Sequence, residues 1–426
     1  MAERKEKRKN DPLRAYILRK QIFAMLFLAG VFGYAGLNAW YGADAWVETV
    51  RESLPEGVSM RTAPDAAAKT VSALDESIIE SMYGRMEFIE TYSYIQVLMD
   101  KREFNNFTYI KDEDGYLHYV SFFEEDTDDM EEYARRLKRL QDCVEPNGTK
   151  VLFFITPGKY VRGVTDFRTG MPINDTDYLV DELLFYLNRY GIETVDCRKY
   201  IPNDSLTIQD AFFKTDHHWK IPAAFTATKV LAEEMEERFG VDLDPDDYYL
   251  NPEQYERVLY RKGMLGSMGR KTGVNFGGLE DFEALWPKFE NHYDRSCMGM
   301  TDETAYHFKG TTEETLMNPD ILLKHEDIYS DSQYSLYLNT LRPYERIINE
   351  DNPDGCRIFA IRDSYFSPMM VFLAPMCGQI DAIWSLEESD SLDIESYVRE
   401  NEFDYIIMEI YPYNIKEDAF NFFKED

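Results

Sequence analysis

The chain has 426 residues, of which 46 are Lys or Arg and 79 are Asp or Glu, giving a formal net charge of −33. Apolar residues make up 44% and aromatic residues 15% of the sequence. This composition supplies enough apolar side chain for a sizeable core and excludes a mostly disordered, collagen-like or disulfide-scaffold protein. The negative charge argues against nucleic acid as the main partner, because basic surfaces bind a phosphate backbone.

The charge is unevenly distributed along the chain. Residues 1–20 hold eight basic and three acidic side chains and form a basic stub, while the other residues carry a net charge of −38. Residues 21–43 (QIFAMLFLAGVFGYAGLNAWYGA) contain no charged side chain. At about 1.5 Å per residue, a helix of this length spans a hydrocarbon core of about 30 Å. The pattern predicts a single-pass membrane anchor at 21–43, with the stub in the cytoplasm and the bulk of the chain extracellular.

Two other interpretations of this segment stay open. Ala43-Asp44-Ala45 loosely resembles the cleavage site of a signal peptide, although the apolar stretch exceeds the about 7–15 residues usual in such leaders. A buried core helix would also be apolar throughout.

The five cysteines are an odd number without C-x-x-C spacing. They are Cys143, Cys197, Cys297, Cys356 and Cys377. They indicate neither a zinc site nor a disulfide framework. One or two bridges stay open, and the sequence assigns none.

A stalk and small local elements follow the anchor. Residues 44–80 are polar and rich in Ala, Ser and Glu, which favours a stalk leading into a helix near 74–92. Residues 107–123 alternate around an Asp-Gly pair and predict a hairpin, because glycine supplies the positive φ of the turn. Residues 128–143 show the periodicity of an amphipathic helix. We expect 81–426 to form the extracellular domain.

A βα pattern dominates this domain. Short apolar runs predict strands at 150–156, 192–195, 357–361, 379–383 and 405–410, and helical patterns occur at 178–190, 222–239, 368–376 and 391–401. The alternation predicts an α/β fold with a mainly parallel sheet flanked by helices. Ligands of such sheets bind at the carboxyl ends of the strands. Residues 241–353 break the pattern, and their aromatic-rich composition predicts an insertion or subdomain that forms one wall of a cleft.

The first candidate for chemistry is Lys214-Thr215-Asp216-His217-His218-Trp219, directly before the helix at 222–239. Hydrolysis or acyl transfer needs a base that titrates near neutrality and a carboxylate that holds the imidazole tautomer, and Asp-x-His supplies both. A turn in which Asp216 caps backbone amides is an equally simple interpretation. A metal site is a third, but no further ligand has suitable spacing.

The second candidate is Ser364, in Arg362-Asp363-Ser364-Tyr365 at the end of a predicted buried strand. Ser367-Pro368 then resembles the N-cap and first residue of a helix. A hydroxyl at that position can act as a nucleophile while nearby amides stabilise an oxyanion. A serine there is also a common capping residue. The two motifs support each other because each occupies a strand-to-helix crossing of the same predicted sheet.

The chain resembles the SGNH-hydrolase-like proteins of the DHHW and alginate O-acetyltransferase type. The main motifs are "TDHHW" at 215–219 and "RDSY" at 362–365. Supporting matches are "DGYL" at 114–117, "TPGKY" at 156–160, Val195-Asp196 and "GSMGR" at 266–270. The likeness covers about 80–426, in the same order, with a membrane-tethered start.

This resemblance implies an acyl-enzyme mechanism on an extracellular glycan. Ser364 matches the nucleophile, His218 the general base and Asp216 the residue that orients the base. His217 falls where the motif varies and stays outside the triad. No Gly/Asn oxyanion pair is evident apart from the Ser364 backbone. Lys159, Tyr160 and Arg270 are weaker candidates for substrate contact.

The resemblance thus predicts a serine-dependent O-acyltransferase, with acetyl as the expected group, that modifies an extracellular or cell-envelope polysaccharide. It requires no cofactor and no metal. By analogy, a multi-spanning membrane protein delivers the acyl group. Two alternatives stay open: a carbohydrate esterase on the same fold, and a non-catalytic glycan-binding or assembly protein.

Overall fold

The computed structural model describes residues 12–53, 63–120, 127–173, 175–298, 306–323, 328–329, 332–338, 342–385 and 393–423. Most of the predicted basic stub, part of the stalk, and the ends of the hairpin at 107–123 and of the helix at 391–401 lie outside these residues. The chain forms two compact units, one that ends at Tyr92 and one that begins at Ser93.

The first unit contains the long helix α2 (Pro12–Ser53), which includes the predicted anchor. Its most apolar stretch has a mean hydropathy of 1.8, so by length and composition the helix can cross a membrane. Its final turns pack on α3 (Ala63–Glu80), where the Trp46 indole donates a hydrogen bond to Ser81 Oγ at 2.7 Å. The first residues after the anchor are therefore helical.

The predicted helix at 74–92 is wrong in its extent. α3 ends at Glu80, and α4 (Arg85–Leu98) begins after a break. Gly84 in this break has a φ of +70°. Glycine adopts this left-handed conformation readily, so Gly84 allows the chain to turn directly before the first residue of α4.

An eight-stranded sheet forms the centre of the second unit. Its order is β5-β4-β13-β11-β12-β10-β8-β9. The first five strands are parallel: β5 (Glu193–Asp196), β4 (Lys150–Ile155), β13 (Tyr405–Ile410), β11 (Arg357–Arg362) and β12 (Gln379–Trp384). Three antiparallel strands follow: β10 (Tyr344–Asn349), β8 (His292–Met298) and β9 (Tyr306–Thr311). The predicted α/β fold is confirmed, with a mixed sheet in which the parallel strands are the majority.

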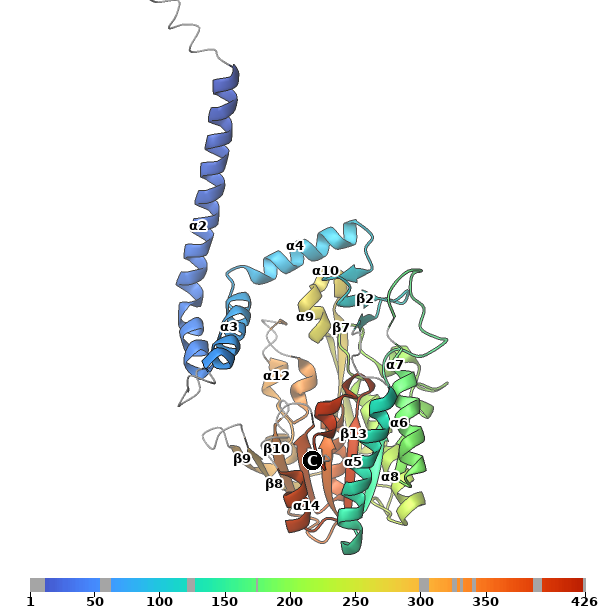
Figure 1. Ribbon diagram of the computed structural model, residues 1–426. Coiled ribbons are helices and arrows are strands. Elements are labelled where there is room, and N and C mark those ends of the chain that lie inside the picture. Colours follow the sequence, from blue (N-terminus) through green and yellow to red (C-terminus); the bar gives the residue numbers. More distant parts are fainter. Residues whose placement is uncertain are drawn as a thin grey trace, which may run out of the picture. The chain divides into compact units, whose positions relative to one another are not determined.

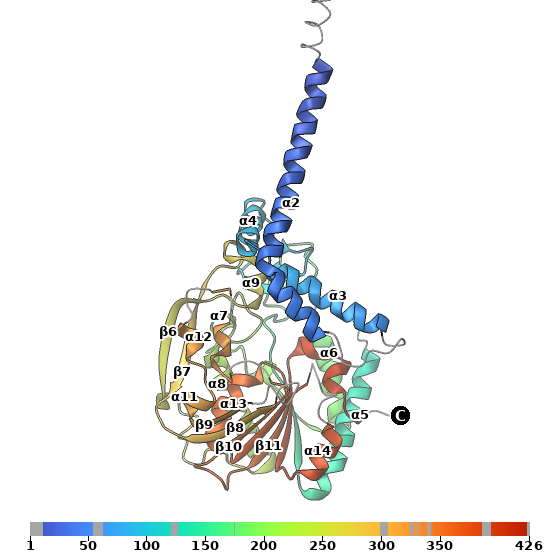
Figure 2. The ribbon, with the colours of Figure 1, turned by 90° about the vertical axis from the view of Figure 1, so that its left-hand side faces the viewer.

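Helices cover both faces of this sheet, as Figure 2 shows. One face carries α5 (Thr127–Val144), α6 (Asp177–Arg189) and α14 (Ile394–Glu400), and the other carries α8 (Ile221–Phe239) and α13 (Phe366–Leu373). Along β4, Val151 and Phe153 pack into the core on the face covered by α5, α6 and α14. Leu152 and Phe154 pack into the core on the face covered by α8 and α13. Side chains alternate along a strand, so a sheet buried on both faces produces the continuous apolar runs seen in the sequence.

Both ends of α8 have the residues that are typical of helix termini. Pro222 lies in its first turn, where the missing N–H costs no hydrogen bond, and Gly240 ends it with a φ of +70°. These ends place the residues before Ile221 in a loop rather than in the helix.

Smaller elements complete the second unit (Figure 1). The predicted hairpin is present as β2 (Tyr109–Lys111) and β3 (Leu117–Tyr119), with Gly115 at a φ of +89° and β1 (Glu103–Phe104) alongside. A separate pair consists of β6 (Tyr255–Met264) and β7 (Glu280–Pro287). The short helices are α7 (Ile208–Ala211), α9 (Ser267–Thr272), α10 (Val274–Gly277), α11 (Thr312–Thr315) and α12 (Asp320–Leu323).

The interval 241–353 therefore contributes a separate strand pair and three strands of the central sheet. Strand β10 (YERIIN) has two adjacent charged residues, Glu345 and Arg346, and only two consecutive aliphatic residues, so it lacks a long apolar run. The boundaries 241–353 and the role of this insertion as a cleft wall stay predictions.

A buried ion chain links β8, β10 and β11. Glu345 on β10 is fully buried between two guanidinium groups. Arg295 on β8 donates to Glu345 Oε2 at 2.7 Å, and Arg362 on β11 donates to Glu345 Oε1. Arg362 and Glu345 are both at 0% exposure, so this neutralisation is needed to keep either charge inside the protein.

Candidate active site

The two sequence motifs meet at the carboxyl end of β11. Ser364 directly follows this strand, and the loop that precedes α8 places His218 against it. His218 Nε2 lies 2.7 Å from Ser364 Oγ, and His218 Nδ1 lies 2.6 Å from Asp216 Oδ1. With the Nδ1 proton donated to the carboxylate, Nε2 can accept the serine hydroxyl proton. The three side chains thus form a continuous hydrogen-bonded chain.

The Asp216 carboxylate is almost completely buried, at 1% exposure, and has a full set of hydrogen bonds. The Ser267 amide donates to its Oδ2 at 2.7 Å, and the His218 amide donates to its Oδ1 at 3.1 Å. Burial by itself would raise the pKa of Asp216, but the charge and hydrogen bond of His218, with contributions from His217 and the Ser267 amide, hold the pKa well below its usual value. Asp216 therefore stays ionised and can stabilise a protonated His218.

Asp363 holds the turn that carries Ser364. Its carboxylate accepts hydrogen bonds from the amides of Tyr365 at 2.9 Å and Tyr411 at 2.7 Å, and from Asn414 Nδ2 at 2.8 Å. Tyr411 and Asn414 follow β13, the neighbour of β11, so Asp363 ties the two strand ends together. The sequence motif contained Asp363, but its role was missed because these partners lie about 50 residues further along the chain.

The predicted cap at Ser367-Pro368 is wrong. α13 begins at Phe366, so Ser367 lies inside the first turn. Ser367 Oγ instead accepts a hydrogen bond from Arg362 Nη1 at 3.1 Å. The first amides of α13 are also occupied: the Phe366 amide donates to the Asp363 carbonyl and the Ser367 amide to the Ser364 carbonyl, each at 3.3 Å.

Aromatic rings fix the orientation of the His218 imidazole. Tyr334 stacks on it with ring centroids 4.0 Å apart and an interplanar angle of 16°. The Tyr334 hydroxyl also donates to the Ser364 carbonyl at 3.3 Å. The centroid of the Tyr365 ring lies 5.2 Å from that of the His218 imidazole, and the Tyr365 hydroxyl donates a hydrogen bond to the His217 carbonyl. Tyr334 belongs to the aromatic-rich interval, where no short motif distinguished it from the other tyrosines.

His217 lies beside the chain of hydrogen bonds but outside it. Its Nδ1 is 3.2 Å from Ser267 Oγ and 3.3 Å from Asp216 Oδ1. Burial and the neighbouring His218 lower the pKa of His217 to about 3, so its ring is neutral near pH 7.

Three side chains at this site also have the spacing of metal ligands. In the part of the chain that the structure describes, Asp216, His217 and His218 are the group of metal-binding side chains whose ligand atoms lie within 4.8 Å of one another. A metal on His218 Nδ1 would replace the hydrogen bond to Asp216, so the metal site and the hydrogen-bonded chain exclude each other.

The chain of hydrogen bonds opens into a pocket of about 230 Å³. Its lining is polar and aromatic: Asp216, His218, Ser267, Arg270, Ser332, Tyr334, Ser335, Tyr337, Ser364 and Ser367. Arg270, a predicted substrate contact, is part of this lining. Lys159 and Tyr160, the other two candidates, are not.

Lys159 supports the loop instead. It is 3% exposed, and its Nζ donates to the carbonyl oxygens of Phe213 at 3.1 Å and Asp216 at 2.6 Å. Its position therefore gives no support to the predicted substrate contact. Burial lowers the pKa of Lys159 to about 8, despite nearby carboxylates that act in the opposite direction.

The Lys159→Met variant is expected to be less stable than the wild type by about 2–3 kcal/mol at pH 7, because buried carbonyl groups lose their donor. The pKa of Lys159 is lower in the folded protein than in the unfolded chain. As the pH rises from 8 towards 10, the folded protein therefore loses the Lys159 proton while the unfolded chain keeps it, and the wild type gains stability. The stability gap between wild type and variant should widen by roughly 2 kcal/mol over this range. Urea unfolding at several pH values measures this gap, and a constant gap would contradict the burial of a titrating Lys159.

Gly266 permits the close approach of α9 to the Asp216 loop. A Cβ at Gly266 would lie 2.4 Å from Asp216 Cβ and 2.5 Å from the Asp216 amide nitrogen. Gly266→Ala is therefore expected to destabilise the fold by about 3 kcal/mol or to displace the loop. Thermal unfolding measures the loss of stability, and labelling of Ser364 by a serine-reactive phosphonate measures the displacement of the loop. Gly158→Ala is the matched control, since its Cβ would meet only ordinary contacts, 3.8 Å from the Tyr411 ring and 4.0 Å from the Tyr413 ring. Equal behaviour of the two variants would refute this packing.

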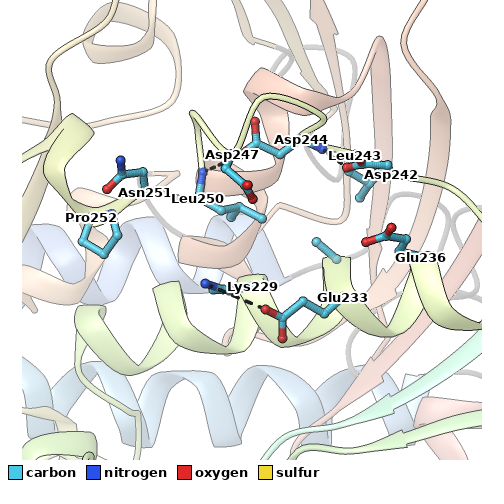
Figure 3. A pocket seen from close by; sticks show the side chains of 11 residues that line it. Lys229, Glu233, Glu236, Asp242, Leu243, Asp244, Asp247, Leu250, Asn251 and Pro252 are labelled. Carbon is cyan, nitrogen blue, oxygen red and sulfur yellow. Dashed lines mark hydrogen bonds and ion pairs between the residues drawn. The ribbon is translucent and has the colours of Figure 1, made fainter.

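A larger hollow, of about 350 Å³, lies elsewhere, between α8 and the following loop (Figure 3). Its lining includes Glu233, Glu236, Asp242, Asp244 and Asp247, with Lys229 paired to Glu233 at 3.8 Å. No serine, cysteine or histidine lines it. The pocket at Ser364 is the candidate active site because the hydrogen-bonded Asp216, His218 and Ser364 line it.

The covered sheet, with a serine, a histidine and an aspartate joined at its carboxyl edge, makes this an α/β protein with a hydrolase-like candidate site. Within that class, residues 111–269 match the family described as "SGNH hydrolase-like domain, acetyltransferase AlgX". This match confirms the resemblance read from the motifs and includes Asp216 and His218. Ser364 lies outside the matched segment.

Solved structures with similar folds agree with this class. PatB1 of Bacillus cereus with a sulfonyl adduct has a TM-score of 0.60 and 16% identity, over 74% of this chain and 97% of that chain. A DHHW family protein from Eubacterium siraeum has a TM-score of 0.52 and 15% identity, over 75% of this chain and 96% of that chain. At these identities the likeness shows the fold. A comparison with curated proteins found no match.

Proposed function

We propose that this protein is a membrane-anchored O-acetyltransferase that modifies an extracellular or cell-envelope polysaccharide through an acyl-serine intermediate. The observation that carries the proposal is the hydrogen-bonded chain from Ser364 through His218 to Asp216 at the mouth of a pocket. The acetyltransferase description of the matched family supports the choice of reaction.

In the first half-reaction, Ser364 Oγ attacks the carbonyl carbon of an acetyl donor while His218 Nε2 takes the hydroxyl proton. Ionised Asp216 stabilises the resulting imidazolium. The tetrahedral intermediate collapses, the donor's leaving group accepts the proton from His218, and acetyl-Ser364 remains.

In the second half-reaction, a sugar hydroxyl takes the place of the leaving group. His218 removes its proton, the sugar oxygen attacks the acetyl carbon, and Ser364 recovers its proton as the acetylated sugar departs. Water in place of the sugar would give acetate, which is esterase activity. The partition between sugar and water is therefore decided by the acceptor that occupies the pocket.

The Ser364 amide is the proposed oxyanion donor. It makes no hydrogen bond to a described residue, whereas the Tyr365, Phe366 and Ser367 amides are occupied. A free N–H beside the reacting carbon can stabilise the developing negative charge. Arg270 lines the same pocket, and we assign it to substrate contact.

For the location, we propose that α2 crosses the membrane with the basic stub in the cytoplasm and the catalytic domain outside. The apolar composition of α2 and the positive charge before it support this orientation. A multi-spanning membrane protein would then supply the acetyl group from the cytoplasmic side.

A transfer assay tests the reaction. The full-length protein, in detergent micelles, is incubated with an activated acetyl ester and with or without a soluble oligosaccharide, and acetate and acetylated sugar are both quantified. Acetylated sugar that appears with an acyl-protein adduct on Ser364 is the expected result. Acetate alone would assign an esterase, and neither product with a range of donors and sugars would favour a binding protein.

A further inference from the structure

Two of the five cysteines lie next to each other at the amino ends of adjacent parallel strands. Cys356 directly precedes β11, and Cys377 lies two residues before β12. Their Sγ atoms are 3.8 Å apart. This is the end of the sheet opposite to Ser364, which follows the carboxyl end of β11.

The backbone around the pair is closely packed. The amides of Gly378 and Gln379 donate to the Cys356 carbonyl at 3.0 and 3.4 Å. A Cβ at Gly378 would lie 2.5 Å from the Gly355 carbonyl oxygen, so glycines at both positions allow the two segments to approach. The segments that carry the thiols are thus fixed side by side, with Sγ atoms 3.8 Å apart compared with about 2.05 Å in a disulfide bond.

The two thiols differ in accessibility. Cys356 is half-buried, whereas Cys377 is 1% exposed. The contact with Cys356, and then burial, raise the pKa of Cys377 well above its usual value, so Cys377 is the poorer initial nucleophile. This arrangement suits an order in which Cys356 reacts first and Cys377 resolves the intermediate.

We propose that Cys356 and Cys377 form a disulfide when the protein meets an oxidising disulfide such as glutathione disulfide. The Cys356 thiolate attacks one sulfur of the oxidant and releases one glutathione thiolate. The Cys377 thiolate then attacks the Cys356 sulfur of the mixed disulfide and releases the second glutathione. The two cysteines lose two protons and two electrons, and the oxidant gains them.

The bridge would enclose a specific part of the fold. Residues 357–376, between the two cysteines, comprise β11, Ser364 and α13. A bridge at the amino end of the strand therefore closes a covalent loop around the segment that presents Ser364, without contact with the pocket. Such a loop restricts the unfolded chain. It would form in an extracellular domain, where disulfides persist.

Thiol mapping tests the proposal without an activity assay. The purified full-length protein is equilibrated in glutathione buffers from reducing to oxidising, denatured in alkylating reagent, and digested for mass spectrometry. The expected result is a Cys356–Cys377 cross-linked peptide in oxidising buffer, with Cys143, Cys197 and Cys297 still alkylated. Free Cys356 and Cys377 in every buffer, or bridges to other cysteines, would overturn the proposal.

Thermal unfolding supplies a second measurement. The oxidised wild type should unfold roughly 5 °C above the reduced wild type. Cys356→Ser should abolish this difference, and Cys143→Ser, which removes a half-buried thiol elsewhere, should retain it. If a serine variant fails to fold, the wild-type mapping still decides. A mapped bridge with no change in Tm would refute its role in constraining the segment.

Discussion

Replacing Ser364 with alanine is expected to abolish acetyl transfer, with a loss of about 10⁶-fold in the rate of the chemical step. The substitution removes only the hydroxyl group, whose oxygen lies 2.7 Å from His218 Nε2, so no nucleophile remains for His218 to deprotonate. The measurement is the initial rate of acetylation of an oligosaccharide, together with the Tm and circular dichroism of the variant. Ser205→Ala, at an exposed serine, is the control and should behave as the wild type.

Two outcomes of this experiment would argue against the proposed mechanism. Unchanged acetylation of the glycan by the Ser364→Ala protein would support a non-catalytic role. A serine-reactive phosphonate that labels the wild type at another residue would place the nucleophile elsewhere. A variant that loses activity together with its cooperative thermal transition would be uninformative, so the folded state must be verified first.

The adjacent histidines provide the second prediction, because each is a control for the other. His218→Ala is expected to lower the transfer rate by about 10⁴–10⁶-fold, since Ser364 loses its base. His217→Ala is expected to lower it less than about 10-fold, since this ring contacts Asp216 and Ser267 but not Ser364. Rate measurements on the two purified variants, side by side, test the assignment.

Addition of imidazole gives an independent readout. The cavity left by His218→Ala can admit a small base, so added imidazole should restore part of the rate in this variant. It should have no effect on His217→Ala or on Ser364→Ala. Equal losses in both histidine variants would contradict the assignment of His218 alone and would favour a joint role for the pair, such as metal binding.

The parallel part of the fold was predictable from the sequence because its physical cause is local. Strands buried on both faces need apolar runs. β4 and β11 have them, and β12 and β13 are apolar between their first and last residues apart from one buried acidic residue each, Asp381 and Glu409. β10 was not recognised because Glu345 and Arg346 are adjacent and interrupt its apolar pattern, while a buried ion pair allows Glu345 inside the sheet. The guanidinium group of Arg295, which stabilises the buried Glu345 carboxylate, comes from a distant part of the sequence.

The site was partly predictable for a related reason. Carboxyl ends of neighbouring parallel strands share one edge of a sheet, so two motifs almost 150 residues apart could be expected to meet. The residues that orient the groups could not be foreseen. Tyr334 and Lys159 act through a ring stack and through backbone carbonyls, and neither contact leaves a local pattern.

The chain of charges from Arg295 through Glu345 to Arg362 has a consequence for how the protein matures. Arg362 lies two residues before Ser364, and its counter-ion comes from β10, a strand that is not its neighbour in the sheet. A truncated polypeptide with the parallel strands alone would leave the buried Arg362 without the Glu345 carboxylate, at an expected penalty of several kcal/mol. We therefore expect the turn that carries Ser364 to reach its final geometry only after the antiparallel edge has assembled, so that the candidate site depends on completion of the whole domain.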